Sequence, residues 1–316
     1  MKKYLHNIPM PIVGIMLSFA ALGNLVQSYG DLYRNILGAL SGVLLIITTI
    51  KFISNFEGLK NELNTPIGAS VFPTYSMGII ILATYMKPYH HALAYATWII
   101  GIILHVIVAI TFTIKFVKNF NMKQVFPSWF IVYVGIAVAA VTGKAFNQTI
   151  GEYCFWFSFI SYLVLLPMIC KRVFIVKEIP EPAMPLLIIF AAPSSLCLAG
   201  YLNILDSKNL ILFWFLLILS QGFYLFALVK LSGLLKLKFY PSYTAFTFPL
   251  VISALALKLS VNFMVTQNIS VGILPIVVKV EELVAIVMVL YVFIRYIFHY
   301  STTCKADKKI SIHPSL

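Results

Sequence analysis

The sequence predicts an all-α polytopic membrane protein, with ten transmembrane helices arranged as five helical hairpins in a quasi-fivefold ring. Hydrophobic residues make up 61% of the 316 residues and charged residues only 10%, against about 45–50% and about 25% in soluble domains. Prolines also recur at steps of 55, 61, 58 and 56 residues, and each opens an apolar stretch. A period of this length indicates a repeated structural unit. The repeated prolines are Pro11, Pro66, Pro127, Pro185 and Pro241.

The repeated unit is a membrane helical hairpin, because two apolar stretches lie within each period. A spanning helix needs about 20 apolar residues, and connections between the stretches are short. We therefore expect a single transmembrane domain over 1–316, with a cytoplasmic tail from about 300 to 316. The ten expected spans are 9–28, 35–54, 66–86, 92–114, 127–143, 151–170, 183–203, 209–229, 241–262 and 274–298.

The formal net charge of +13 reflects membrane topology rather than binding to nucleic acid. With ten spans, the ends of the even-numbered helices share one side with the start of the chain. That side carries seventeen basic residues, and the opposite loops carry only Arg34, Lys87, Lys144 and Lys208. This positive-inside bias predicts a multi-pass protein of the plasma (inner) membrane with both termini in the cytoplasm.

Helix-breaking residues indicate which helix of each hairpin faces the centre. Four of the five units have a proline or glycine seven or eight residues after the opening proline. Breaks in a spanning helix are tolerated where the helix is buried in protein or lines a watery cavity. We therefore expect the odd-numbered helices to form an inner ring that lines a central pore. The breakers are Pro73, Gly135, Pro193 and Pro249, and the first helix has Gly14 and Gly23 nearby.

The inner helices contain no acidic residue within the expected spans, which argues against a cation pathway. Lys144 and Lys258 share an offset of seventeen residues from their opening prolines, near the outward mouth, where ammonium groups concentrate anions. Lys123 and Lys238 are candidates for the same role at the cytoplasmic mouth. The alternative for Lys144 and Lys258 is that their side chains extend to the membrane interface.

We expect the other polar residues in the spans to have structural roles. Lys279, Glu281 and Glu282 open the tenth span, and we expect a local lysine–glutamate pair there. His105 in the fourth span is expected to bond between helices. The sequence has no hydrolase, metalloprotease or phosphate-binding motif. We therefore expect no enzyme activity, no cofactor and no metal site.

Several segments resemble the tellurite-resistance/dicarboxylate transporter family, which includes bacterial TehA and the slow anion channels of plant guard cells. The resemblance covers essentially the whole chain and rests on the order and spacing of short motifs. It implies ten helices in a quasi-fivefold ring, one pore per protomer, a homotrimer, and a phenylalanine of the ninth helix that blocks the pore. The motifs are Asn7-Ile-Pro-Met-Pro-Ile-Val-Gly-Ile-Met, Pro127-Ser-Trp-Phe, Ala192-Pro193-Ser194-Ser195, Tyr243-Thr-Ala-Phe-Thr-Phe-Pro-Leu and Ser253-Ala-Leu-Ala.

By this resemblance the blocking residue is Phe248. Its position suits the role, because it immediately precedes the kinking Pro249, about 10 Å along the helix from Pro241. An aromatic ring at a constriction closes a path by excluding water. TehA has glycine where this chain has Pro249, so the kink here is more similar to that of the plant channels.

Two functional hypotheses of different classes follow. The first is a gated anion channel that passes small anions through a phenylalanine-plugged pore in the lipid bilayer. The second is a proton-coupled carrier of C4-dicarboxylates such as malate, and a sulfite or oxyanion exporter is a further alternative. A protonatable group in the inner ring would favour the carrier, and the inner spans as drawn contain no acidic residue.

Overall fold

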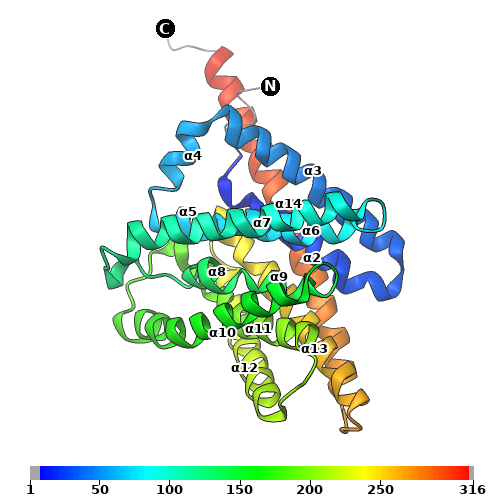
Figure 1. The fold of residues 1–316 in the computed structure, drawn as a ribbon. Helices are drawn as coiled ribbons and strands as arrows, with labels where there is room; N and C mark the ends of the chain where they lie inside the picture. Colours follow the sequence, from blue (N-terminus) through cyan, green and yellow to red (C-terminus); the bar gives the residue numbers. More distant parts are fainter. Residues whose placement is uncertain (1–7, 313–316) are drawn as a thin grey trace.

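The computed structural model describes the backbone of residues 8–312 and the side chains of residues 8–301. Within this part of the chain every regular element is helical, as predicted. Eight helices are long and apolar enough to cross a membrane, and a shorter apolar helix covers Trp129–Gly143. The structure is therefore that of a helical polytopic membrane protein (Figure 1).

Each of the five proline-opened stretches is built from two consecutive helical segments, and at every junction except the one at Thr247 the backbone stays in the right-handed helical region. The segments are η1 (Met10–Ile12) with α2 (Val13–Val26), α5 (Pro66–Val71) with α6 (Pro73–Met86), α8 (Trp129–Val134) with α9 (Ala137–Gly143), η6 (Glu181–Phe190) with α11 (Ala191–Ile204), and η7 (Pro241–Phe246) with α13 (Phe248–Thr266).

The stretches between them form longer helices without such a central break. They are α3 (Asp31–Ser54), α7 (His91–Phe112), α10 (Gln148–Cys170), α12 (Leu210–Leu234) and α14 (Leu274–Ile312). A π-helical turn extends α7 as η3 (Thr113–Val117) and α10 as η5 (Lys171–Val176). α14 continues as helix to Ile312, past the point near residue 300 where we expected the tail to begin. Short elements complete the fold: η2 (Gln27–Tyr29), α4 (Phe56–Glu62) and η4 (Met122–Gln124).

Burial separates the two groups of helices. In the helices over Met10–Tyr29, Pro66–Met86, Glu181–Ile204 and Pro241–Thr266, 61–94% of the most apolar window is buried. In α12 and in the spans built on α3, α7 and α10 the share is only 22–33%. The exposed residues of this second group are mostly large apolar side chains, such as Ile46, Ile107 and Val164. Such a surface suits lipid, so the second group forms the outer layer.

The inner helices pack on one another in a closed sequence. α2 packs on α6, α6 on α9, α9 on α11, α11 on α13, and α13 again on α2. Each outer helix packs on the inner helix of its own hairpin, from α3 on α2 to α14 on α13. Figure 1 shows one example, in which α8 and α9 lie between α7 and α10.

The breaks in the inner helices follow from local chemistry. Pro249 is the second residue of α13 and Pro73 is the first residue of α6. Proline lacks the N–H that would bond to the preceding turn, but it fits the first turn of a new helix. Gly135 separates α8 from α9, and a Cβ atom there would meet the Ile131 carbonyl oxygen at 2.3 Å and the Met77 sulfur at 2.7 Å. Only glycine allows this close approach.

Buried hydroxyl groups join the inner helices to their neighbours. Ser195 Oγ of α11 lies 2.7 Å from Ser220 Oγ of α12 and 2.9 Å from Ser253 Oγ of α13. Ser70 and Ser128 make a similar contact of 2.6 Å between the second and third hairpins. Such small polar residues let helix backbones approach closely and hydrogen-bond within a membrane.

His105 bonds between helices, as the sequence analysis predicted. Its Nδ1 lies 2.9 Å from Ser76 Oγ on α6, and its Nε2 lies 3.1 Å from the Val132 carbonyl oxygen on α8. Both ring nitrogens are therefore used in joining α7 to the two inner helices. This imidazole has a structural role.

The close packing at Gly135 yields a stability prediction. Gly135→Ala should lower the free energy of unfolding by about 1–3 kcal/mol, the usual cost of overpacking a core. Gly222→Ala is the matched control, because a Cβ atom there meets nothing within 4 Å, and it should not lower stability, since alanine favours the helix more than glycine. Thermal unfolding of both variants in detergent measures the difference. Equal melting temperatures would show that the backbone at Gly135 has more room than the structure gives it.

Candidate functional site

A small cavity lies where the inner helices are interrupted. Its volume is about 50 Å³, which gives room for only a few water molecules. All five proline-opened stretches contribute side chains to its wall. The structure brings together Gly14, Gly135, Pro193, Phe248 and Pro249 of the predicted set at this cavity.

Pro73 is the one predicted kink residue that is not part of the cavity wall. It is buried at the start of α6, and its neighbours Val71 and Thr74 line the cavity instead. Gly14 borders the cavity because it lies against Thr244, where a Cβ atom would come within 3.0 Å of the threonine Cβ. This contact brings α2 close to η7.

The cavity wall repeats along the chain with the spacing of one helical face. Counted from the opening proline, twelve of the seventeen lining residues fall four, seven, eight or eleven positions later, and the others fall one, three or five positions later. The twelve are Ile131, Ile189 and Ala245 at four, Val134, Ala192 and Phe248 at seven, Thr74, Gly135, Pro193 and Pro249 at eight, and Met77 and Leu196 at eleven. In the sequence only the prolines and glycine near offset eight stand out, and the other lining residues carry no such local signal.

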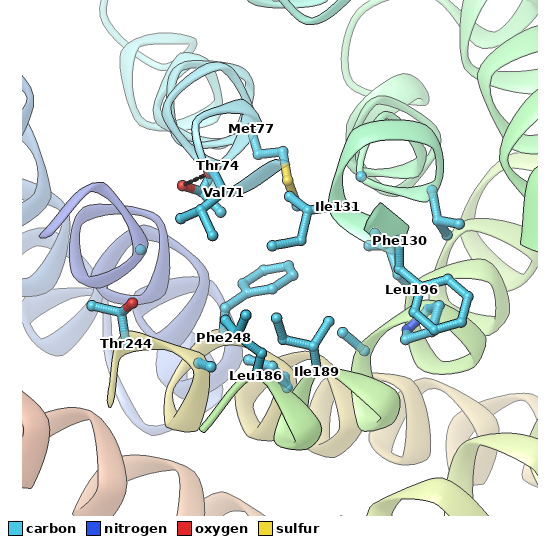
Figure 2. Close-up of a pocket in the computed structure, with 17 residues that line it drawn as sticks. Val71, Thr74, Met77, Phe130, Ile131, Leu186, Ile189, Leu196, Thr244 and Phe248 are labelled. Carbon is cyan, nitrogen blue, oxygen red and sulfur yellow. Dashed lines mark hydrogen bonds between the residues drawn. The ribbon is translucent and has the colours of Figure 1, made fainter. Parts of the chain in front are cut away.

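The Phe248 side chain occupies the middle of this cavity. Figure 2 shows its ring between Ile131 and Ile189, pointing away from the helix that carries it. The residue is 7% exposed. At the equivalent position of the third and fourth units stand Val134 and Ala192, which are smaller. One bulky ring therefore fills the space that the smaller side chains leave.

A break at Thr247 positions Phe248. Thr247 has φ −106° and ψ −83°, outside the helical region, between η7 and α13. Its hydroxyl donates to the Thr244 carbonyl oxygen at 2.6 Å, and Ser18 Oγ of α2 lies 2.7 Å from it. These bonds fix the direction in which α13 starts and hence the place of the Phe248 ring.

The cavity is apolar and carries no charge. No ionisable side chain is among the described residues that line it. The hydroxyls of Thr74 and Thr244 each donate to a carbonyl oxygen three residues earlier in the chain, at 2.7 and 3.4 Å. An ion here would find few groups that replace its hydration shell.

Lys258 forms a largely buried ion pair. Its Nζ lies 2.7 Å from Glu282 Oε1, with side chains 23% and 4% exposed. It also donates to Ser28 Oγ at 2.7 Å and to the Leu25 carbonyl oxygen at 3.0 Å, and Tyr29 donates to the other Glu282 oxygen at 2.5 Å. The charge of Lys258 is thus compensated, and the lysine joins α13 to α2 and α14.

This contact corrects the expectation of a local pair within the tenth span. Glu282 pairs with Lys258 of the preceding helix, and the exposed Lys279 forms no ion pair among the described residues. The reason is that Glu282 faces α13, where it is buried and needs a cation. Sequence distance could not reveal this contact, because 24 residues separate the partners.

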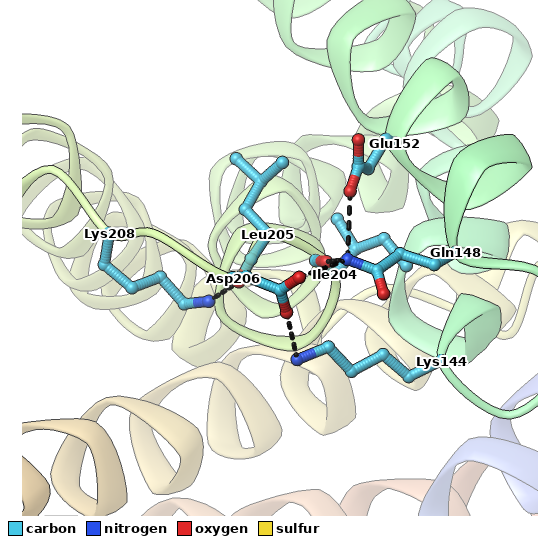
Figure 3. A network of polar contacts seen from close by, with 7 residues as sticks. All are labelled: Lys144, Gln148, Glu152, Ile204, Leu205, Asp206 and Lys208. Carbon is cyan, nitrogen blue, oxygen red and sulfur yellow. Dashed lines mark hydrogen bonds and ion pairs between the residues drawn. The ribbon is translucent and has the colours of Figure 1, made fainter.

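Lys144 lies in an exposed polar network at the ends of α9 and α11 (Figure 3). Its Nζ lies 3.2 Å from Asp206 Oδ1. Gln148 donates to Asp206 at 2.9 Å and to Glu152 at 3.0 Å, and Lys208 donates to the Leu205 carbonyl oxygen. The Gln148 hydrogen bond, followed by the Lys144 ammonium, holds the pKa of the Asp206 carboxyl below its ordinary value.

The other two predicted lysines lie at the opposite ends of the helices. Lys123 pairs with Glu178 at 3.0 Å, and both side chains are mostly exposed. Lys238 lies in the connection between α12 and η7, where a hydrogen bond with Tyr240 raises the pKa of its ammonium group. Neither lysine is among the residues that line the cavity.

These features define the class of the protein: a helical polytopic membrane protein with an apolar cavity among its interrupted inner helices. The family model for the voltage-dependent anion channel, SLAC1, matches residues 7–297, and the chain belongs to this family. The match confirms the family resemblance seen in the sequence, and the family is one of anion channels and transporters. A search of curated proteins found no match to this chain.

The Lys258–Glu282 pair yields a second prediction. Lys258→Met should lower the free energy of unfolding by about 3 kcal/mol, because it leaves a buried carboxylate without its cation. The double variant Lys258→Met/Glu282→Gln should recover part of that loss, since no charge is then left buried. Lys279→Met, at an exposed neighbouring position, should change stability little. Chemical denaturation in detergent measures all three, and a double variant less stable than Lys258→Met would contradict the assignment.

Proposed function

We propose that the chain is a gated anion channel whose pore runs through the ring of inner helices and is closed by Phe248. The observation that carries this proposal is the Phe248 ring in the middle of a cavity to which all five interrupted helices contribute. The closed packing order of α2, α6, α9, α11 and α13 supports a quasi-fivefold ring around the same axis.

The proposed architecture has ten spans. Besides the eight long helices, it counts the shorter helix over Trp129–Gly143 and the apolar part of α14. The seventeen-to-four distribution of basic residues supports cytoplasmic termini and the plasma membrane. Family resemblance supports a homotrimer with one pore in each protomer.

The neutral lining of the cavity and the exposed lysines outside it together favour anions over cations. The lining is neutral, so it offers no acidic ring of the kind that cation pathways use. The exposed lysines near its two ends, Lys144 on one side and Lys123 and Lys238 on the other, are the candidates for attracting anions. Lys258 holds its helix in place, because Glu282 compensates its charge.

Replacement of Phe248 tests the proposal most directly. Phe248→Ala should raise the basal anion conductance at least tenfold, because it removes the ring that fills the cavity and lets water enter from both mouths. The measurement is current in planar bilayers with chloride, nitrate, sulfite and malate in turn. Phe246→Ala is the matched control, since Phe246 is also buried, lies in the same proline-opened stretch and does not line the cavity.

The alternatives give different results in the same experiment. A proton-coupled dicarboxylate carrier would lose saturable malate uptake in Phe248→Ala and show no current. An oxyanion exporter that works as a channel would conduct sulfite in preference to the other anions. If Phe246→Ala and Phe248→Ala both lowered stability and neither conducted, Phe248 would be a packing residue and the gate would lie elsewhere.

The exposed Lys144–Asp206 pair tests electrostatic attraction at the mouth. In a conducting Phe248→Ala background, Lys144→Gln should lower the anion current and Asp206→Asn should raise it, each by about twofold at low salt. Both effects should vanish at high salt, because screening acts over about 10 Å at 0.1 M. Acidification should act like Asp206→Asn. The pKa of Asp206 is lowered, so its charge persists below the usual carboxyl range and is lost as the pH falls through that lowered value. Changes that did not depend on salt would point to packing.

A further inference from the structure

A second, much larger hollow lies on the outside of the helical bundle. It is a groove of about 800 Å³ between α7 and α10, and its floor is formed by α8 and by Ile136, which lies between α8 and α9. Figure 1 shows these four helices side by side, with α8 and α9 between the other two. The groove exists because the inner helix here is short, while α7 and α10 with their π-helical turns are long.

The walls of this groove are apolar and face outward. Ile110 and Ile114 stand on the α7 side, and Ile160 and Val164 stand on the α10 side, each between 55% and 67% exposed. In a bilayer, water does not fill such an apolar groove. It needs an apolar occupant of flexible shape.

The polar groups of Tyr133, Trp129 and His105, which line the groove, already have hydrogen-bond partners within the protein. Tyr133 Oη and Thr113 Oγ1 lie 2.8 Å apart, and Thr113 also donates to the Ala109 carbonyl oxygen at 2.7 Å. Trp129 Nε1 donates to the Gln124 carbonyl oxygen at 3.0 Å. Both nitrogens of His105 are bonded, as described above. A hydrocarbon chain can therefore lie over these groups without depriving them of partners.

One end of the groove is basic. Lys118 directly follows the lining residue Val117, and Lys171 follows the lining residue Met168 by three positions. Both lysines are exposed, and in the described part of the chain the three ion pairs involve other lysines. From His105 to Val117 the groove runs for about 18 Å along α7, close to the roughly 15 Å of hydrocarbon in one leaflet.

We propose that this groove binds an acyl chain of an anionic phospholipid, with the lipid phosphate held between Lys118 and Lys171. The apolar walls hold the chain, and the basic end selects a negatively charged headgroup by charge complementarity. In the orientation proposed above, the basic end is cytoplasmic, so the lipid comes from the cytoplasmic leaflet.

The position of the groove makes the lipid a neighbour of the central cavity. Tyr133 and Ile136 line the groove, whereas Ile131, Val134 and Gly135 of the same segment line the cavity. The break at Gly135 thus forms a shared wall. A bound acyl chain packs against the back of that wall.

The test measures phospholipid binding to the full-length protein by native mass spectrometry after delipidation in detergent. Phosphatidylglycerol and phosphatidylcholine are titrated separately. The wild type is expected to bind phosphatidylglycerol at least tenfold more tightly, because only this lipid carries a net negative charge for the two lysines. The readout is the mass of bound lipid, so the result does not depend on whether the chain conducts anions.

Two pairs of variants locate the lipid. Ser161→Trp places an indole in the groove and should weaken phosphatidylglycerol binding at least fivefold, while Leu163→Trp, on the exposed side of α10 outside the groove, should not. Lys118→Gln/Lys171→Gln should reduce the affinity for phosphatidylglycerol to that for phosphatidylcholine. Lys60→Gln/Lys230→Gln removes the same charge from exposed sites away from the groove and should preserve the preference. If Ser161→Trp does not fold, Ala109→Phe fills the groove from the α7 side.

Three results would overturn the proposal. One is equal binding of both lipids to the wild type. Another is undiminished phosphatidylglycerol binding to a folded groove-filling variant. The third is that the groove-filling variant no longer forms the oligomer while its lipid binding is unchanged. That result would show that the groove is an interface between copies of the chain.

Discussion

A helix that is interrupted inside a membrane leaves backbone groups that lipid cannot satisfy, and this constraint shapes the whole molecule. Each of the five inner stretches contains a junction between two helical segments, and the backbone leaves the helical region at Thr247 while it stays within that region at the other four. Because these junctions cannot face lipid, all five segments are packed together and covered by outer helices that have no break of this kind. Hydroxyl groups such as that of Ser18 bond to the broken segments from the neighbouring helix. The breaks, in turn, provide the space in which the cavity lies.

Charge is distributed so that the lining of the cavity is neutral. The buried Glu282 is compensated by Lys258 at the end of the bundle, and the cavity itself is lined without ionisable groups. The remaining exposed pairs, such as Lys144 with Asp206, lie in loops where water screens them. In the channel proposed above, an anion would be attracted by groups at the mouths and opposed by the apolar lining. In that proposal a single bulky side chain is enough for closure, since an apolar constriction excludes water.

The repeat also explains why Phe248 stands out among 25 phenylalanines. The same helical face recurs in the units, and the positions equivalent to Phe248 hold Val134 and Ala192 in two of them. In the proposed ring of helices, small residues at one level leave a gap that the Phe248 side chain can fill. The outer groove between α7 and α10 breaks the symmetry in another way, because the third inner helix is the shortest.

The sequence by itself determined the helical membrane class, and it shows the proline period and the prolines and glycine at Pro73, Gly135, Pro193 and Pro249. These features are local, because hydropathy and the missing N–H of proline act within a few residues. The family and the choice of Phe248 came from motif order rather than from composition. Only the tertiary structure decided which side chains meet across helices: Lys258 with Glu282, Lys144 with Asp206, and the lining residues at offsets four, seven and eleven. The physical reason is that these contacts depend on the rotation of each helix about its axis, which is set by packing against several neighbours at once.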